Sequence, residues 1–159
     1  MLYLVRHAKA GSRHDFKGND RLRPLSPPGR RQAEAIATRL TPPLTSAGVT
    51  VLLSSPYLRC MQTLRPLAKA IGATVEPDER LAEGRSYIDV LELLGLLPDE
   101  TALCSHGDVI PDTIAALERR GCEFISPPDW RKGSVWVLER DSSGEIASAE
   151  SWPPPDIGR

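Results

Sequence analysis

Two short apolar runs in this chain are each followed, two residues later, by a histidine. The first run, Leu2–Val5, leads through Arg6 to His7, and the second, Ala102–Cys104, leads to His106. Runs of this length with polar residues around them are typical of buried strands. Open α/β sheets bind ligands at the carboxyl ends of their parallel strands. We therefore expect the two histidines to lie at one site.

Helix-like segments separate the predicted strands, and this alternation favours a mostly parallel sheet. The first helix has Ser26 as its N-cap and Pro27 as its first residue. Its apolar stripe ends at Leu40, and Pro42 and Pro43 are expected to stop it there. Three further strands are predicted, at Val49–Leu53, Ser134–Leu138 and Ile146–Ala149.

Three more helices follow from the sequence. The second begins at the Ser55-Pro56 turn and ends before Gly72, a residue type common at helix C-caps. The third covers Ile88–Leu94. The fourth has Asp108 as its N-cap and ends near Arg119, whose charge suits the negative end of the helix dipole.

The last two predicted strands flank Asp141–Gly144, a turn typical of an antiparallel hairpin. With 159 residues, 40% of them hydrophobic, the chain is long enough for one domain and too short for two. We therefore expect residues 1–159 to form a single α/β domain. It is predicted to be a three-layer sandwich, with a mostly parallel central sheet, helices on both faces and an antiparallel C-terminal hairpin.

Composition excludes several classes of protein. A net charge of −1 argues against a protein that binds nucleic-acid polymers in general. No stretch approaches the roughly 20 apolar residues of a membrane span, and the apolar start is too short for a signal peptide. A cytoplasmic protein without a membrane partner is therefore expected. The three cysteines form no C-x-x-C pair and no ligand spacing is found, so we expect neither a disulfide framework nor a metal site.

Positive charge is concentrated near the N-terminus. Between positions 6 and 31, eight basic side chains stand against two acidic ones, a local charge of +6. Such a segment attracts small polyanions, although some of its charges, such as Lys17, serve to solvate a polar loop. The candidates for substrate binding in this segment are Lys9, Arg13 and Arg23.

Arg59 is predicted to join the two histidines. It lies in the first turn of the second helix, directly after the strand Val49–Leu53, and so belongs to the same edge of the sheet. Arginine guanidinium groups bind phosphate oxygens in bidentate fashion, and a neutral imidazole can attack phosphorus. The convergence of Arg6, Arg59 and two histidines therefore indicates phosphate chemistry.

Several segments resemble the histidine phosphatase (phosphoglycerate mutase-like) superfamily. They are Leu4–His7, Leu53–Thr63 and Ser105–Gly107. The compact length and the Arg23–Ala33 segment are similar to the small SixA-type phosphohistidine phosphatases. Arg6–Arg13, Phe16–Asp20 and Lys132–Ser134 also resemble the phosphatase half of proteins whose other half is a Nudix hydrolase. The 159 residues are expected to hold the phosphatase half alone.

The resemblance implies a metal-independent phosphatase that uses no cofactor. It implies that His7 is the nucleophile and becomes phosphohistidine during the reaction. The phosphoryl group of the substrate would be bound by Arg6, Arg59 and His106, which would also act in catalysis. Glu83 falls where many family members carry their acidic proton donor, although the usual residues around that acid are not reproduced.

Three functions stay open at this point. The first is hydrolysis of phosphohistidine in proteins or of small phosphate esters, and the second is hydrolysis of nucleoside diphosphates or other pyrophosphates. The third is a phosphate-binding regulatory module with little turnover, supported by Ala8, which stands where the family usually has glycine. Glycine is needed only for positive φ or very close approach, so we expect the methyl to fit an extended backbone. A cysteine phosphatase is disfavoured because no cysteine begins a C-x₅-R loop.

Overall fold

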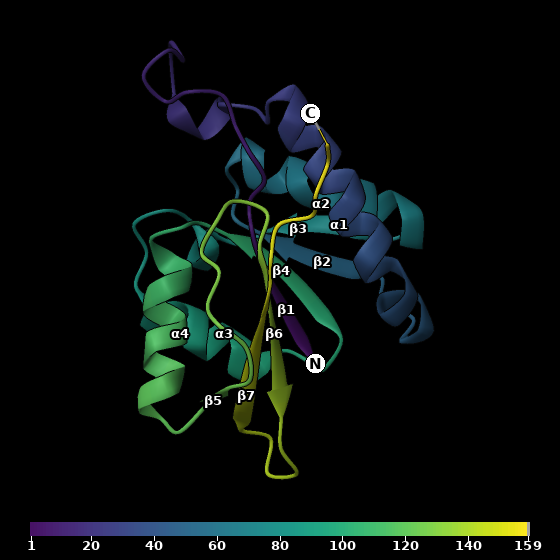
Figure 1. Cartoon of the computed structure of the whole chain (residues 1–159), viewed down its shortest axis with the longest axis vertical. Coiled ribbons are helices and arrows are strands. Elements are labelled where there is room, and N and C mark those ends of the chain that lie inside the picture. Colours follow the sequence, from purple (N-terminus) through teal and green to yellow (C-terminus); the bar gives the residue numbers. More distant parts are fainter. Residues whose placement is uncertain (159) are drawn as a thin grey trace.

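A computed structural model describes residues 1–158, and within them seven strands form one sheet in the order β3-β2-β4-β1-β6-β7-β5 (Figure 1). The strands are β1 (Leu2–Arg6), β2 (Val51–Ser54), β3 (Thr74–Pro77), β4 (Thr101–Ser105), β5 (Glu123–Phe124), β6 (Val135–Arg140) and β7 (Ile146–Trp152).

The sheet is mixed, with parallel pairing on one side of β1. β1 pairs in parallel with β4, β4 with β2, and β2 with β3. On its other side β1 pairs in antiparallel fashion with β6, and β6 forms an antiparallel hairpin with β7. β5 adds a short parallel pairing to β7. The predicted mostly parallel sheet with an antiparallel C-terminal hairpin is therefore confirmed.

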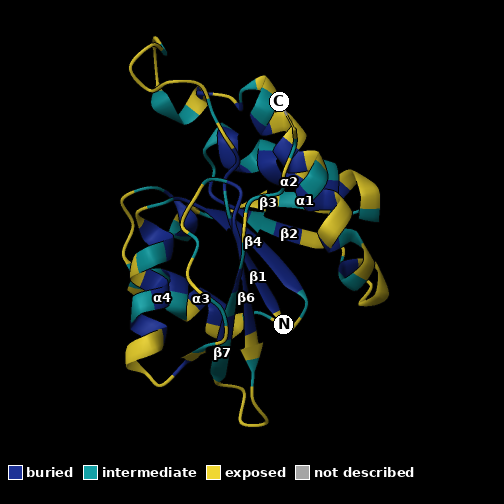
Figure 2. Ribbon diagram, viewed as in Figure 1, coloured by how far each residue is buried: buried dark blue, intermediate teal, exposed yellow. Residues whose placement is uncertain are grey.

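Four α-helices in residues 1–158 cover the two faces of the sheet (Figure 1). They are α1 (Pro27–Ser46), α2 (Leu58–Ile71), α3 (Tyr87–Leu96) and α4 (Val109–Arg119), with short 3₁₀ helices η1 (Asp20–Leu22) and η2 (Glu79–Leu81) in the loops. Alternate residues of a strand point to opposite faces. Accordingly, Leu4 packs in the cluster beneath α3 and α4, and Val5 packs beneath α1 and α2. Figure 2 shows the central strands buried between these layers.

The first helix is longer than the sequence predicts. Pro42 and Pro43 do not stop it, and α1 continues to Ser46. Each proline removes a backbone donor from the helix, which is destabilising. Leu40 and Leu44, however, are fully buried against the sheet. We attribute the extra turn to this burial, because tertiary packing can override a local helix-breaking signal.

Other differences lie at the ends and edges of elements. β3 and β5 were not predicted, because one is a partly exposed edge strand and the other has two residues. Asp108 occupies the N-cap position of α4, yet its side chain makes no cap hydrogen bond. Its Oδ2 instead accepts the N–H of Gly84 at 2.8 Å. Gly72 does end α2 in the left-handed conformation, with φ of 71°.

Within residues 1–158, the helices fall short of the length and apolar character that crossing a membrane would require.

The start of α1 makes a very close contact with the chain after β1. A Cβ atom on Gly29 would lie 1.8 Å from the carbonyl oxygen of Lys9. That carbonyl also accepts hydrogen bonds from the N–H and the hydroxyl of Ser26, at 3.0 and 3.2 Å. Because the oxygen is held in place, we expect Gly29→Ala to lower the free energy of unfolding by about 1–3 kcal/mol, measured by urea denaturation.

Gly95→Ala is the matched control, since Gly95 also lies in a helix and a Cβ there would meet nothing within 4 Å. We expect it to leave stability unchanged or raise it by about 0.5–1 kcal/mol. A Gly29→Ala protein as stable as the control would contradict the close contact.

Candidate active site

Three strand ends bring the predicted site residues together. His7 follows β1, His106 follows β4, and Arg59 is the second residue of α2, shortly after β2. The ring centroids of the two histidines are 5.4 Å apart, in an edge-on arrangement. All three side chains are buried, and Arg59 is 0% exposed.

His7 is held in one tautomer. Its Nδ1 lies 2.8 Å from the carbonyl oxygen of Ala8, which can only accept a hydrogen bond, so Nδ1 carries the hydrogen and Nε2 keeps its lone pair. Burial lowers the pKa of His7 well below 6.5; its bond to Ala8 opposes this shift, and the positive charges of His106, Arg59 and Arg6 add to it. The imidazole is therefore neutral near pH 7, as a nucleophile must be.

His106 presents a different face to the site. Its Nε2 lies 2.8 Å from the hydroxyl of Ser55, which also accepts the N–H of Tyr57 at 3.3 Å. If the ring is neutral and Nε2 accepts the hydroxyl hydrogen of Ser55, the ring hydrogen is on Nδ1. The protonated ring also carries a hydrogen on Nδ1. Nδ1 is buried and has no hydrogen-bond partner within residues 1–158. His106 therefore offers an unused donor.

Unpaired buried donors gather at this site. Within residues 1–158, four buried side-chain nitrogen or oxygen atoms lack a partner, and three of them are Nε of Arg6, Nε of Arg59 and Nδ1 of His106. An unsatisfied buried polar group costs about 1–3 kcal/mol, so native proteins rarely keep one without a reason. Three cationic or donor groups around one neutral imidazole suit an oxyanion.

Arg6 is fixed by close backbone contacts. Its Nη1 donates to the carbonyl of Trp130. A Cβ atom on Gly107 would lie 2.5 Å from Cζ of Arg6, so the glycine after His106 is what lets the guanidinium approach. Burial lowers the pKa of Arg6, and the nearby carboxylate of Asp108 opposes that shift.

Two carboxylates fix Arg59. Its Nη1 donates to the backbone oxygen of Asp20 at 3.0 Å, and its Nη2 lies 3.2 Å from Oδ2 of Asp20 and 3.5 Å from Oε2 of Glu83. Asp20 also accepts Nε of Arg23 at 2.8 Å. Burial raises the pKa of Asp20, but Arg23, Arg59 and Arg13 together hold it below its usual range.

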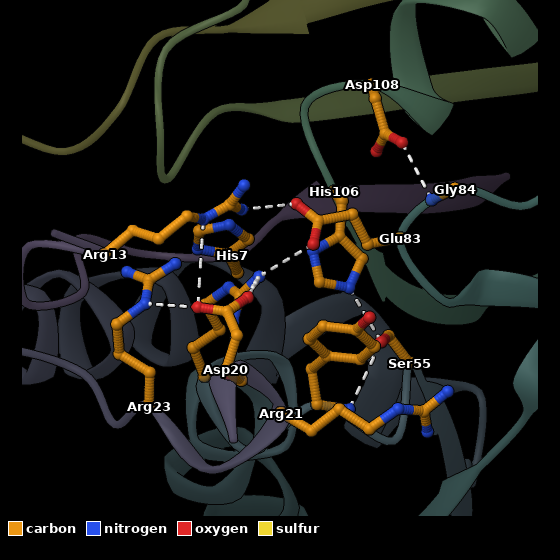
Figure 3. Close-up of polar contacts among 12 residues, drawn as sticks. His7, Arg13, Asp20, Arg21, Arg23, Ser55, Glu83, Gly84, His106 and Asp108 are labelled. Carbon is orange, nitrogen blue, oxygen red and sulfur yellow. Dashed lines mark hydrogen bonds and ion pairs between the residues drawn. The ribbon is translucent and has the colours of Figure 1, made fainter. Parts of the chain in front are cut away.

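A cavity of about 320 Å³ opens in front of His7. Glu83, Arg13 and Arg23 line it, and Oε1 of Glu83 accepts Nη2 of Arg13 at 2.6 Å (Figure 3). Three of the four loop candidates named from sequence thus lie beside His7. Lys9 does not, because its side chain lines a neighbouring groove.

Ala8 fits without strain. Among the described residues, Glu100 is the one non-glycine residue with positive φ, so Ala8 does not need glycine. Its methyl is fully buried against Leu25 and Ala33, and its N–H donates to Thr63 Oγ1 at 3.0 Å. The expectation that a methyl is tolerated here is confirmed.

Sequence reasoning missed two residues of the site. Asp20 contacts Arg59, and Lys132 also lines the cavity. The one sequence signal for either residue was its place in a segment that resembles Nudix-linked proteins, Phe16–Asp20 for the first and Lys132–Ser134 for the second. Within residues 1–158 no three His, Cys, Asp or Glu side chains are grouped so as to hold a metal ion.

The buried, positively charged surroundings of His7 lead to a prediction about its titration. We expect the His7 ring to be protonated with a midpoint below pH 6.5. Two-dimensional NMR of the ring carbons and nitrogens measures this midpoint. Added inorganic phosphate should move the His7 midpoint upward, because an anion offsets the surrounding cations. A midpoint at or above 6.5 in the free protein would contradict the neutral imidazole.

Comparison with known proteins agrees with these observations. Residues 2–92 match the family model described as Histidine phosphatase superfamily (branch 1). The 8-oxo-(d)GTP phosphatase of Mycolicibacterium smegmatis is 36% identical over 160 residues, covering 96% of this chain and 48% of that protein. This chain thus spans about half the length of that curated relative.

Solved structures share the fold. A SixA protein from Nakamurella multipartitia has a TM-score of 0.68 at 27% identity, covering 98% of this chain and 96% of that one. The protein histidine phosphatase SixA complexed with tungstate has a TM-score of 0.70 at 22% identity, covering 96% of each chain. This chain belongs to the histidine phosphatase superfamily.

Proposed function

We propose that this chain is a metal-independent phosphatase that works through a phosphohistidine on His7, and that residues 1–159 act as one catalytic domain. The observation that carries the proposal is the set of unpaired donors on Arg6, Arg59 and His106 around a neutral, buried imidazole. The leading substrate class is phosphohistidine in proteins or a small phosphate ester. The arginines supply the positive charge that a metal ion supplies in other phosphatases.

In the first step, the lone pair of Nε2 of His7 attacks phosphorus. The bond between phosphorus and the leaving atom breaks; that atom is an oxygen in a phosphate ester and a nitrogen in phosphohistidine. The electron pair stays on the leaving atom, and Glu83 supplies a proton to it. Meanwhile the N–H donors of Arg6, Arg59 and His106 bind the remaining phosphoryl oxygens. Negative charge on the substrate offsets the cations that keep His7 neutral beforehand.

In the second step, water attacks the phosphorus of phosphohistidine. Glu83 accepts a proton from the water, and the bond between phosphorus and Nε2 breaks. Its electron pair returns to His7, which is neutral again, and inorganic phosphate leaves. Glu83 thus regains the proton that it gave up in the first step.

A covalent intermediate is open to direct detection. After brief mixing with radiolabelled acetyl phosphate, we expect acid-labile, alkali-stable label on the protein, and none on His7→Ala. His14→Ala is the matched control and should keep the label, because His14 is exposed in the polar loop. Label that persists in His7→Ala would refute the assignment. Binding of phosphate with neither label nor turnover would instead support a regulatory module.

The role of Glu83 as proton donor depends on the leaving group. We expect Glu83→Gln to slow hydrolysis of glycerol phosphate by roughly 10²–10⁴-fold, because an alkoxide is a poor leaving group. Acetyl phosphate, whose leaving group needs no proton, should be affected much less. Steady-state rates of phosphate release measure both.

Glu79→Gln provides the control, since this exposed acid on the same segment pairs with Arg21 outside the cavity. Equal losses with the two substrates would mean that Glu83 orients Arg13 and Arg59 rather than donating a proton.

A specific observation favours a second substrate class, nucleoside diphosphates or other pyrophosphates. Arg13, Arg23 and Lys132 line the cavity in addition to the arginines assigned to the transferred group, so further negative charge can be accommodated. The name of the relative from Mycolicibacterium smegmatis, an 8-oxo-(d)GTP phosphatase, points the same way.

A further inference from the structure

Lys132 connects the cavity in front of His7 with a second hollow. It lines the 320 Å³ cavity and also a neighbouring groove of about 540 Å³. Lys9, Arg131 and the segment Pro154–Gly158 form other parts of that groove. A substrate whose phosphoryl group lies at His7 can therefore extend past Lys132 into the groove.

The Lys132 ammonium has no counter-ion within residues 1–158. Among the other cations of this region, Arg13 is paired with Glu83 and Arg131 with Asp129, whereas Lys9 forms no ion pair within residues 1–158. Lys132 is half-buried, and its pKa is lowered first by burial and then by the arginines nearby. An anion placed beside this ammonium would relieve the repulsion, so the environment favours a ligand of negative charge.

The backbone of Lys132 is firmly held. The N–H of Gly133 lies 3.2 Å from the carbonyl oxygens of both Arg6 and His7. Gln32, which is 3% exposed, donates through Nε2 to the carbonyl of Lys132 at 3.3 Å and accepts the N–H of Lys9 at 2.9 Å. A single buried amide thus ties both lysine backbones to α1, and Lys132 keeps a fixed position relative to His7.

We propose that Lys132 determines substrate specificity by binding a second phosphate, carried on the leaving group, and that the groove beside it takes the rest of that leaving group. This inference rests on the proposed function. Of the two substrate classes considered there, it favours nucleoside diphosphates and other pyrophosphates over phosphohistidine and small phosphate esters. When the bond between the transferred phosphorus and the bridging oxygen breaks, the electron pair stays on the leaving phosphate. The ammonium then stabilises the charge that develops there.

The test compares a substrate that carries this second phosphate with one that does not. We expect kcat/KM to be higher for ADP than for p-nitrophenyl phosphate, and we expect Lys132→Gln to lower the ratio of the two values at least about tenfold. Lys17→Gln is the matched control, because it removes an exposed lysine that lines neither hollow. That variant should leave the ratio unchanged.

Two outcomes would overturn the inference while leaving the phosphatase proposal intact. One is a wild-type protein that does not prefer ADP, and the other is an equal loss with both substrates in Lys132→Gln. A protein that hydrolyses neither substrate would count against the proposed function. In that case, calorimetric measurement of ligand binding tests whether Lys132 binds a second phosphate. Lys132→Gln should weaken binding of methylenediphosphonate at least about tenfold more than binding of inorganic phosphate; equal weakening would refute the second-phosphate site.

Discussion

The site depends on keeping an uncharged imidazole among buried guanidinium groups. Burial and neighbouring cations both oppose protonation of His7, and its bond to the Ala8 carbonyl fixes which nitrogen is free. The same cations would repel one another if nothing compensated them. The carboxylates of Asp20 and Glu83 compensate Arg59 through its Nη2 atom, and the Trp130 carbonyl holds Arg6. What the protein leaves uncompensated are the Nε donors and the His106 Nδ1, which is where a phosphoryl group is expected.

The sheet enforces this arrangement through strand register. β1 and β4 are adjacent and parallel, with Arg6 opposite Ser105, so the residues that follow them emerge side by side. The His7 N–H donates to the Ser105 carbonyl at 3.1 Å and extends the pairing by one residue. Both strands are buried on two faces, so a one-residue shift of register would move every side chain into the packing of the opposite face. Stability of the core and geometry of the site therefore have the same origin.

Sequence reasoning succeeded where a local signal exists and failed where a contact is long-range. His7 and His106 were found because each follows a short apolar run, and an amphipathic pattern located the helices. The end of α1 was wrong, since two prolines are a local stop signal whereas the burial of Leu44 depends on the folded sheet. Asp20 and Lys132 were missed for a related reason. Arg59, the partner that brings Asp20 to the site, lies 39 residues from it, and Gln32, which holds the Lys132 backbone, lies 100 residues away; no spacing within the chain records such contacts.

The structure also changes the meaning of the basic N-terminal segment. Its charge of +6 suggested a general field that attracts polyanions. In the folded chain much of that charge is paired, since Arg13 contacts Glu83, Arg21 contacts Glu79 and Arg23 contacts Asp20. The pairs of Arg13 and Arg21 are exposed and contribute little to stability, so their main effect here is to orient side chains and reduce the field, whereas Arg23 is buried. Under the proposed function, recognition of a phosphorylated substrate depends on a few buried, directional N–H donors at fixed positions, which distinguish one anion from another better than a diffuse field does.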